Sequence, residues 1–204
     1  MEPFQLPFDI SISRLESDNK LQDAVNSVLQ RWLAQPYELG FLLCAGTQIW
    51  YTLLMLEENS YDPNPKKDIE FFSEADLQGI LNFLTRYGLQ HFADNPFFNS
   101  YFGYMISLMP HFFPADNWDY LEWQEKGNSM ISRAYTLNSD SPFIRALYFG
   151  LNSNERNASH RFNACKEIWS KITPTQWGCS EVQQYFFRIL SGEHFYPNAY
   201  NTEE

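Results

Sequence analysis

The stretch YELGFLLCAGTQIWYTLLMLEE, residues 37–58, decides the fold of this chain. Between Glu38 and Glu57 it holds eighteen consecutive residues without a formal charge. Apolar residues recur along it at helical spacing, and the other positions are only weakly polar. A helix that is apolar all round is covered by other elements and not by water. The stretch therefore predicts the central helix of an all-helical domain.

The same stretch is long enough to test as a membrane span, because a helix of eighteen residues measures roughly 27 Å. However, Thr47, Gln48 and Thr52 lie inside it, and no Lys/Arg cluster flanks it to set an orientation. Both flanks are acidic. We therefore expect a buried core helix and no membrane association.

Helix start and stop signals divide most of the remaining chain into further helices. Ser73 with Asp76 three residues later predicts a capping box, and Asn95 before Pro96 predicts another helix start. Gly88 is expected to end the helix that follows Ser73, and Pro142 to start a helix. The predicted fold is all-α, with about eight helices stacked as antiparallel hairpins, either α-solenoid-like or as an irregular bundle.

One helical domain, residues 18–191, is expected, which is long enough to bury a substantial core. Residues 1–17 contain Pro3 and Pro7, and their apolar residues alternate with polar ones. This pattern predicts an N-terminal arm that is extended or forms one edge strand. Residues 192–204 are expected to be a flexible tail.

Charge is distributed unevenly along the chain. The net charge is −11; residues 1–120 hold six Lys/Arg and sixteen Asp/Glu (net −10), and residues 121–204 hold eight and nine (net −1). Such a chain repels nucleic acid and anionic lipid and attracts a basic protein. Three widely spaced cysteines and an N-terminus without signal-peptide features lead us to expect a cytoplasmic protein.

Catalytic and metal-binding motifs are not found in the sequence. The four histidines stand singly, without the H-x-x-x-H or H-E-x-x-H spacing of metal sites, and no G-x-S-x-G is present. His160 and Cys165 are five residues apart, which is off the spacing of neighbours on a helix. Glycines are scattered, so no phosphate-binding loop is predicted. We expect a non-enzymatic protein without metal or other cofactor.

Acidic residues gather in two groups that predict a surface for a basic protein partner. One group follows the end of the central helix to the next helix start, and the other surrounds two tryptophans. The predicted partner-binding residues are Glu57, Glu58, Asp62, Asp68, Glu70, Glu74, Asp76, Asp116, Trp118, Asp119, Glu122, Trp123 and Glu125. Carboxylates would speed encounter with a basic protein, and exposed rings would supply anchors. The alternative explanation is the preference of helix N-termini for acid, together with a solvated loop.

One segment carries a resemblance to helical repeats. Residues 134–142, AYTLNSDSP, followed by FIRA at 143–146, resemble the junction between two tetratricopeptide repeats. There, one helix ends in a small-residue, acidic, proline-containing turn and the next begins at once. The resemblance implies a stack of helical hairpins of the tetratricopeptide or HEAT-like α-solenoid type. The overall profile of size, missing catalytic motifs and concentrated acid is similar to that of bacterial toxin-immunity proteins.

These observations together predict a protein-binding domain, and more specifically an immunity or antitoxin protein that neutralises a basic toxin such as a nuclease. Two alternatives stay open. One is a tetratricopeptide-like adaptor that binds peptides in a concave groove. The other is an all-helical enzyme whose site is assembled from scattered residues without a recognisable motif. The sequence does not indicate an oligomeric state.

Overall fold

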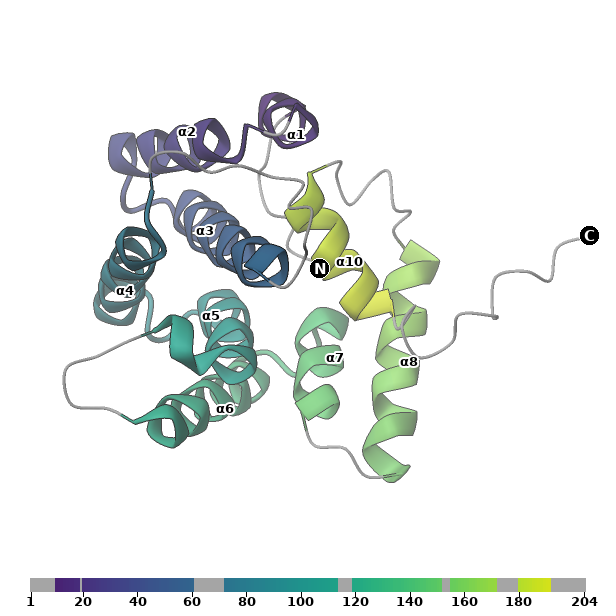
Figure 1. The fold of residues 1–204 in the computed structure, drawn as a ribbon. Helices are drawn as coiled ribbons and strands as arrows, with labels where there is room; N and C mark the ends of the chain where they lie inside the picture. Colours follow the sequence, from purple (N-terminus) through teal and green to yellow (C-terminus); the bar gives the residue numbers. More distant parts are fainter. Residues whose placement is uncertain are drawn as a thin grey trace, which may run out of the picture.

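The computed structural model describes residues 10–18, 20–60, 72–113, 119–151, 155–171 and 180–191. These residues form nine α-helices and one 3-10 turn. The elements are α1 (Ile10–Ser17), α2 (Leu21–Ala34), α3 (Leu39–Ser60), α4 (Glu74–His91), α5 (Pro96–Leu108), η1 (Pro110–Phe112), α6 (Tyr120–Leu137), α7 (Pro142–Leu151), α8 (Glu155–Lys171) and α10 (Glu181–Ser191) (Figure 1). The prediction of an all-α fold of about eight helices is confirmed.

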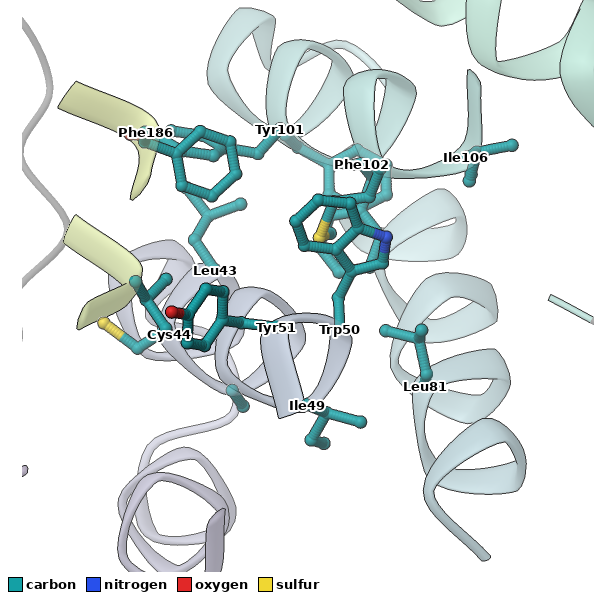
Figure 2. Close-up of a cluster of buried hydrophobic side chains, with 14 of the residues drawn as sticks. Leu43, Cys44, Ile49, Trp50, Tyr51, Leu81, Tyr101, Phe102, Ile106 and Phe186 are labelled. Carbon is teal, nitrogen blue, oxygen red and sulfur yellow. The ribbon is translucent and has the colours of Figure 1, made fainter. Parts of the chain in front are cut away.

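Helix α3 is the central helix, with α2, α4, α5 and α10 packed around it (Figure 1). By length and composition it is also apolar enough to cross a membrane, but 72% of its apolar window is buried inside the structure. Trp50, near its middle, is fully buried and lies 5.5 Å from the ring of Tyr185 on α10, centroid to centroid. Figure 2 shows this core, with Phe102 of α5 and Leu81 of α4 drawn around α3.

Helices that follow one another pair as antiparallel hairpins. In four pairs, a residue at the start of the first helix contacts a residue near the end of the second. These contacts are Ser11–Arg31 for α1 and α2, Tyr37–His91 for α3 and α4, Asp94–Arg133 for α5 and α6, and Arg145–Glu167 for α7 and α8. Within the pairs α3–α4, α5–α6 and α7–α8, the two helices therefore run in opposite directions.

The last described helix returns to the first described helix. The backbone N–H of Glu181, at the start of α10, donates to Oε2 of the buried Glu16 on α1, with a distance of 2.7 Å. A carboxylate at this position also suits the positive end of the helix dipole. In an open solenoid each repeat contacts only its neighbours. Because α10 packs on α3 and bonds to α1, the arrangement is an irregular bundle.

Three boundary predictions are confirmed, one of which is Pro142 as the first residue of α7. Ser73 and Asp76 form the capping box at the start of α4, where the Asp76 N–H donates to Ser73 Oγ at 3.1 Å. Asn95 caps α5 by accepting a hydrogen bond from the Phe97 N–H at 2.9 Å, and Pro96 is the first helical residue. These signals act within one helical turn, which is why they can be read locally.

Two other boundary predictions are wrong. Residues 10–17 form α1 and not an extended arm, because Ile12 and its neighbours one turn apart bury one face of a short helix against the core. Residues 1–9 and 192–204 lie outside the described residues. Gly88 does not end α4, which continues to His91. Its missing side chain instead makes room for the ring of Phe98 on α5.

Two glycines let α5 and α6 approach closely. A Cβ atom on Gly127 would lie 2.6 Å from the backbone nitrogen of Ser107 and 2.8 Å from the carbonyl oxygen of Gly103. Both of these are backbone atoms of a packed helix, so they cannot move aside as the tip of a flexible side chain could. The absence of a side chain at Gly127 is therefore a packing requirement.

We expect Gly127→Ala to lower the free energy of unfolding by about 1–3 kcal/mol, because overpacking outweighs the better helix propensity of alanine. Gly79 is the matched control, since it also lies inside a helix but an added Cβ would meet nothing within 4 Å. Gly79→Ala should raise stability by roughly 0.5–1 kcal/mol. Urea denaturation measures both, and a shift of the same sign for both variants would contradict this account.

The middle of α3 holds polar side chains in an apolar setting. Gln48 is fully buried, and neither of its amide atoms has a hydrogen-bond partner among the described residues. The same is true of the Thr52 hydroxyl. By contrast, the Thr47 hydroxyl donates to the carbonyl oxygen of Leu43 at 2.7 Å. A buried polar group without a partner costs about 1–3 kcal/mol, so this segment lowers the stability of the core.

Replacing Gln48 by the similarly sized Met should therefore raise the free energy of unfolding by about 1–3 kcal/mol. Thr47→Val serves as the control, because the hydroxyl that it removes is already satisfied, and it should bring no gain. Chemical denaturation of the two variants distinguishes the cases. A loss of stability in Gln48→Met would mean that the amide is hydrogen-bonded in solution.

Candidate protein-binding surface

Three acidic helix termini lie toward one end of the molecule: the C-terminus of α3 and the N-termini of α4 and α6. This follows because α3 and α4 run in opposite directions, and because η1 and the residue after it contact both α3 and α6. Glu57 Oε2 lies 3.5 Å from His111 Nε2, which ties α3 to η1, and the ring of Phe113 packs 5.9 Å from Trp123 of α6. We call this region the acidic end. Its described carboxylates are Glu57, Glu58, Glu74, Asp76, Asp119, Glu122 and Glu125. The other predicted residues, Asp62, Asp68, Glu70, Asp116 and Trp118, lie outside the described residues.

Carboxylates at the acidic end are poorly matched by cations. Elsewhere, several acidic side chains are ion-paired, as in Asp94–Arg133, Glu167–Arg145 and Asp18–Lys20. At the acidic end, only Glu57 has a cationic partner within the described part of the chain, and that partner is a histidine. The last turn of α3 contains no basic residue, so Glu57 and Glu58 also oppose the helix dipole. The negative charge of this end is therefore left largely unneutralised by the described residues.

Three of the seven carboxylates have a structural role as well. Asp76 accepts hydrogen bonds from the Ser73 hydroxyl at 2.7 Å and from the Ser73 N–H at 3.1 Å. Asp119 and Glu122 form a second capping box at the start of α6. The preference of helix N-termini for acid thus explains these three. Glu57, Glu58, Glu74 and Glu125 lie outside both capping boxes.

The structure corrects the expected role of Trp123. Its side chain is only 6% exposed and packs against the ring of Phe113, so it is a core residue and not a surface anchor. The reason is the spacing of the buried face of α6, which places Trp123 four residues before Gly127 and seven before Met130. That spacing is visible in the sequence and was the signal for burial.

Two apolar residues that the sequence analysis did not select are exposed at the acidic end. Tyr120 is 51% and Leu121 is 62% exposed, and both lie in the first turn of α6 between Asp119 and Glu122. Leu121 precedes the buried Trp123 by two residues, which places it off the buried stripe of α6. Tyr120 precedes Trp123 by three residues, on that stripe, and is exposed because it is the first residue of the helix. Acidic and exposed apolar side chains therefore occur together at the acidic end, but the exposed apolar residues are Tyr120 and Leu121 and not Trp123.

Other reactive side chains in the described part of the chain are arranged as structural groups. Burial raises the pKa of the Cys165 thiol, which is the opposite of what an activated nucleophile needs. The His160 ring stacks on Phe149 with centroids 4.9 Å apart. Within the described ranges, no three His, Cys, Asp or Glu side chains gather closely enough to hold a metal ion.

The hydrogen bonds from Ser73 lower the pKa of Asp76 below its ordinary value of 3.8. A carboxyl whose pKa is lower in the folded state stabilises the fold above its unfolded pKa, and this stabilisation is lost as the pH falls. We therefore expect the stability advantage of the wild type over Asp76→Asn to shrink as the pH falls from neutral through 3.8 and below. Denaturation at a series of pH values measures it. Glu125→Gln, at an exposed carboxylate outside both capping boxes, should show no such trend, and a similar trend there would contradict the explanation.

Comparison with known proteins gives no further guide to this surface. No protein-family model, no curated protein and no solved structure matches the chain. Its function is therefore argued from the geometry and charge of the described residues.

Proposed function

We propose that this chain is a non-enzymatic domain that binds a basic protein through its acidic end. In its more specific form, the proposal is an immunity or antitoxin protein of the cytoplasm that neutralises a basic toxin such as a nuclease. One observation carries it: three helix termini that lie toward one end bear seven carboxylates, and six of the seven have no cationic partner among the described residues.

The charge would act mainly on the encounter. Each of the unpaired carboxylates is exposed, so its field extends into solvent over about one Debye length, roughly 8 Å at physiological ionic strength. Neighbouring carboxylates reinforce one another, and the summed field attracts a basic surface and orients it. The same field repels nucleic acid and anionic lipid, which disfavours both as partners.

Contact area would come from the apolar residues among the acids. Tyr120 and Leu121 present exposed apolar surface within the first turn of α6. Burying a leucine side chain at an interface contributes about 1.5–3 kcal/mol, more than an exposed ion pair does. Carboxylates would thus set the rate of association, and these two side chains the lifetime of the complex.

A nuclease is a fitting target for such a surface. Proteins that bind nucleic acid carry grooves rich in Lys and Arg, because these residues neutralise the phosphate backbone. A cluster of carboxylates offers the same groove a protein substitute for phosphate. Occupying the groove would block the toxin without any chemistry by the inhibitor, which requires no catalytic residues in this chain. The described cysteines, Cys44 and Cys165, are buried, as suits a reducing compartment.

Charged residues and exposed apolar residues of the acidic end should affect different rate constants of binding. We expect Glu58→Gln/Glu125→Gln to slow association with a captured basic partner about tenfold at low salt and to change dissociation little. Leu121→Ser should speed dissociation about tenfold and leave association nearly unchanged. Surface plasmon resonance over a salt series measures both rates.

Glu38→Gln/Asp140→Asn is the matched control, because it removes the same number of charges from exposed positions outside the acidic end. This variant should bind as the wild type does. The partner itself is found by affinity capture from cell lysate, with wild-type and variant chains as separate baits. Capture of one basic protein by the wild type and the control, and relief of its toxicity on co-expression, would support the proposal. Equal association rates for all three chains, or rates that salt does not change, would overturn it.

A further inference from the structure

Buried polar atoms without hydrogen-bond partners gather on α2 and on the helices that pack against it. On α2 they are Oε1 of Gln22 and Nε1 of Trp32, and on α3 they are both amide atoms of Gln48 and the hydroxyl of Thr52. The hydroxyl of Tyr87 on α4 is a further one, and its ring lies 5.4 Å from the Trp32 ring, centroid to centroid. None of these atoms has a partner among the described residues. Each loses its hydrogen bonds to water on burial and gains none from the protein, so the contacts of α2 are weaker than their apolar area suggests.

Gln48 and Thr52 lie on the side of α3 that α2 covers. On α10, the ring of Tyr185 lies 5.5 Å from the Trp50 ring and 5.9 Å from the Tyr51 ring, centroid to centroid. At about 100° per residue, Gln48 and Thr52 follow Tyr51 around α3 by about 60° and about 100°, away from Trp50. The helix that follows α10 in this sense is α2 (Figure 1), and Figure 2 shows Trp50 and Tyr51 turned toward α5 and α10. The buried residues of α2 are Leu21, Ala24, Val25, Val28 and Trp32, a mainly apolar face.

Helices α1 and α2 are bonded to each other and joined to α3 by a short connection. Nη2 of Arg31 on α2 donates to Oγ of Ser11 on α1 at 3.3 Å. Residues 35–38 connect α2 to α3 and form a turn outside both helices. A few residues of this kind can absorb the change in backbone angles that a hinge requires. On the other side, the hydrogen bond from the Glu181 N–H to Glu16 joins α1 to α10. The α1–α2 hairpin is therefore built as one piece with a possible pivot.

The contact between α5 and α6 is of the opposite kind. Its backbones approach closely at Gly103 and Gly127. The buried Ser107 hydroxyl on α5 donates to Oδ1 of Asn128 on α6 at 3.0 Å, so its polar group is satisfied. Separation of these two helices would break this bond and a tightly packed interface, whereas separation of α2 from α3 lets unsatisfied groups bond to water.

We propose that the α1–α2 hairpin is a hinged cover over α3, which opens as one unit while the other helices stay packed. Hydration of the Gln48 amide and the Thr52 hydroxyl offsets part of the cost of exposing the apolar face of α2. Opening is thus a sub-global step of lower free energy than complete unfolding, and the open molecules are a minor population. This inference goes beyond the proposed function and does not depend on it, because the acidic end belongs to α3, α4 and α6, which stay packed.

Native-state hydrogen exchange of the wild-type chain, followed by mass spectrometry in a urea series, measures the opening. Amides in the middle of α2 should exchange at least tenfold faster than those of α5 and α6. Their rates should rise little at low urea, because opening exposes less surface than complete unfolding. Equal rates with equal urea dependence in all these helices would overturn the proposal. A gradual decrease in rate from the ends of α2 to its middle would also overturn it, since fraying and not opening of the unit would then explain the exchange.

The role of the buried amide is tested by Gln48→Met, which removes the hydration that the open state gains. This variant should slow exchange in the middle of α2 about tenfold. Thr47→Val is the matched control on α3, because its hydroxyl is already bonded to the Leu43 carbonyl, and it should bring no such slowing. No slowing in Gln48→Met, or equal slowing in Thr47→Val, contradicts the assignment.

The independence of the hairpin is tested by Gly127→Ala, which strains the contact between α5 and α6. Exchange in α5 and α6 should become at least fivefold faster, while exchange in the middle of α2 should stay as in the wild type. An equal acceleration in all three helices would mean that α2 is released only by complete unfolding, and the proposal would be wrong. If Gly127→Ala does not fold, the urea dependence of the wild type and the Gln48→Met comparison still decide the question.

Discussion

Desolvation of α3 on every side is the constraint on which the rest of the structure depends. A helix with eighteen consecutive uncharged residues gains free energy only if its whole circumference is covered. Helices α2, α4, α5 and α10 supply that cover. Because α10 comes last in the chain, it has to return across the molecule, and Glu16 of α1 receives its first N–H group. The bundle therefore closes around α3 and not along an open superhelix. Gln48 and Thr52 oppose the burial of α3, because their side-chain polar atoms have no hydrogen-bond partner among the described residues.

The acidic end is a consequence of helix direction more than of local sequence. Because α3 and α4 run in opposite directions, and because η1 and the residue after it contact both α3 and α6, the C-terminus of α3 and the N-termini of α4 and α6 lie toward one end, and these termini carry the acidic residues. Helix dipoles favour acid at the two N-termini, and the capping boxes of Asp76 and Asp119 use that preference. No such preference exists for Glu57 and Glu58 at a C-terminus, where the dipole opposes them. Repulsion among these groups costs stability, and a cost of this kind is what proteins tolerate at functional surfaces. The acidic end offers charge with two apolar side chains, Tyr120 and Leu121, which suits fast association with a basic protein.

Local signals in the sequence were sufficient for some of these features. The burial of α3, the capping box of Ser73 and Asp76, and the start of α5 at Pro96 follow from patterns within a few helical turns. What the sequence by itself determined was therefore the helices, their caps and the excess of acid. Only the tertiary structure decided that Gly88 accommodates Phe98 and that residues 10–17 fold as α1. The physical reason is that burial depends on which helix lies opposite, and that neighbour is set by contacts between residues far apart in the chain.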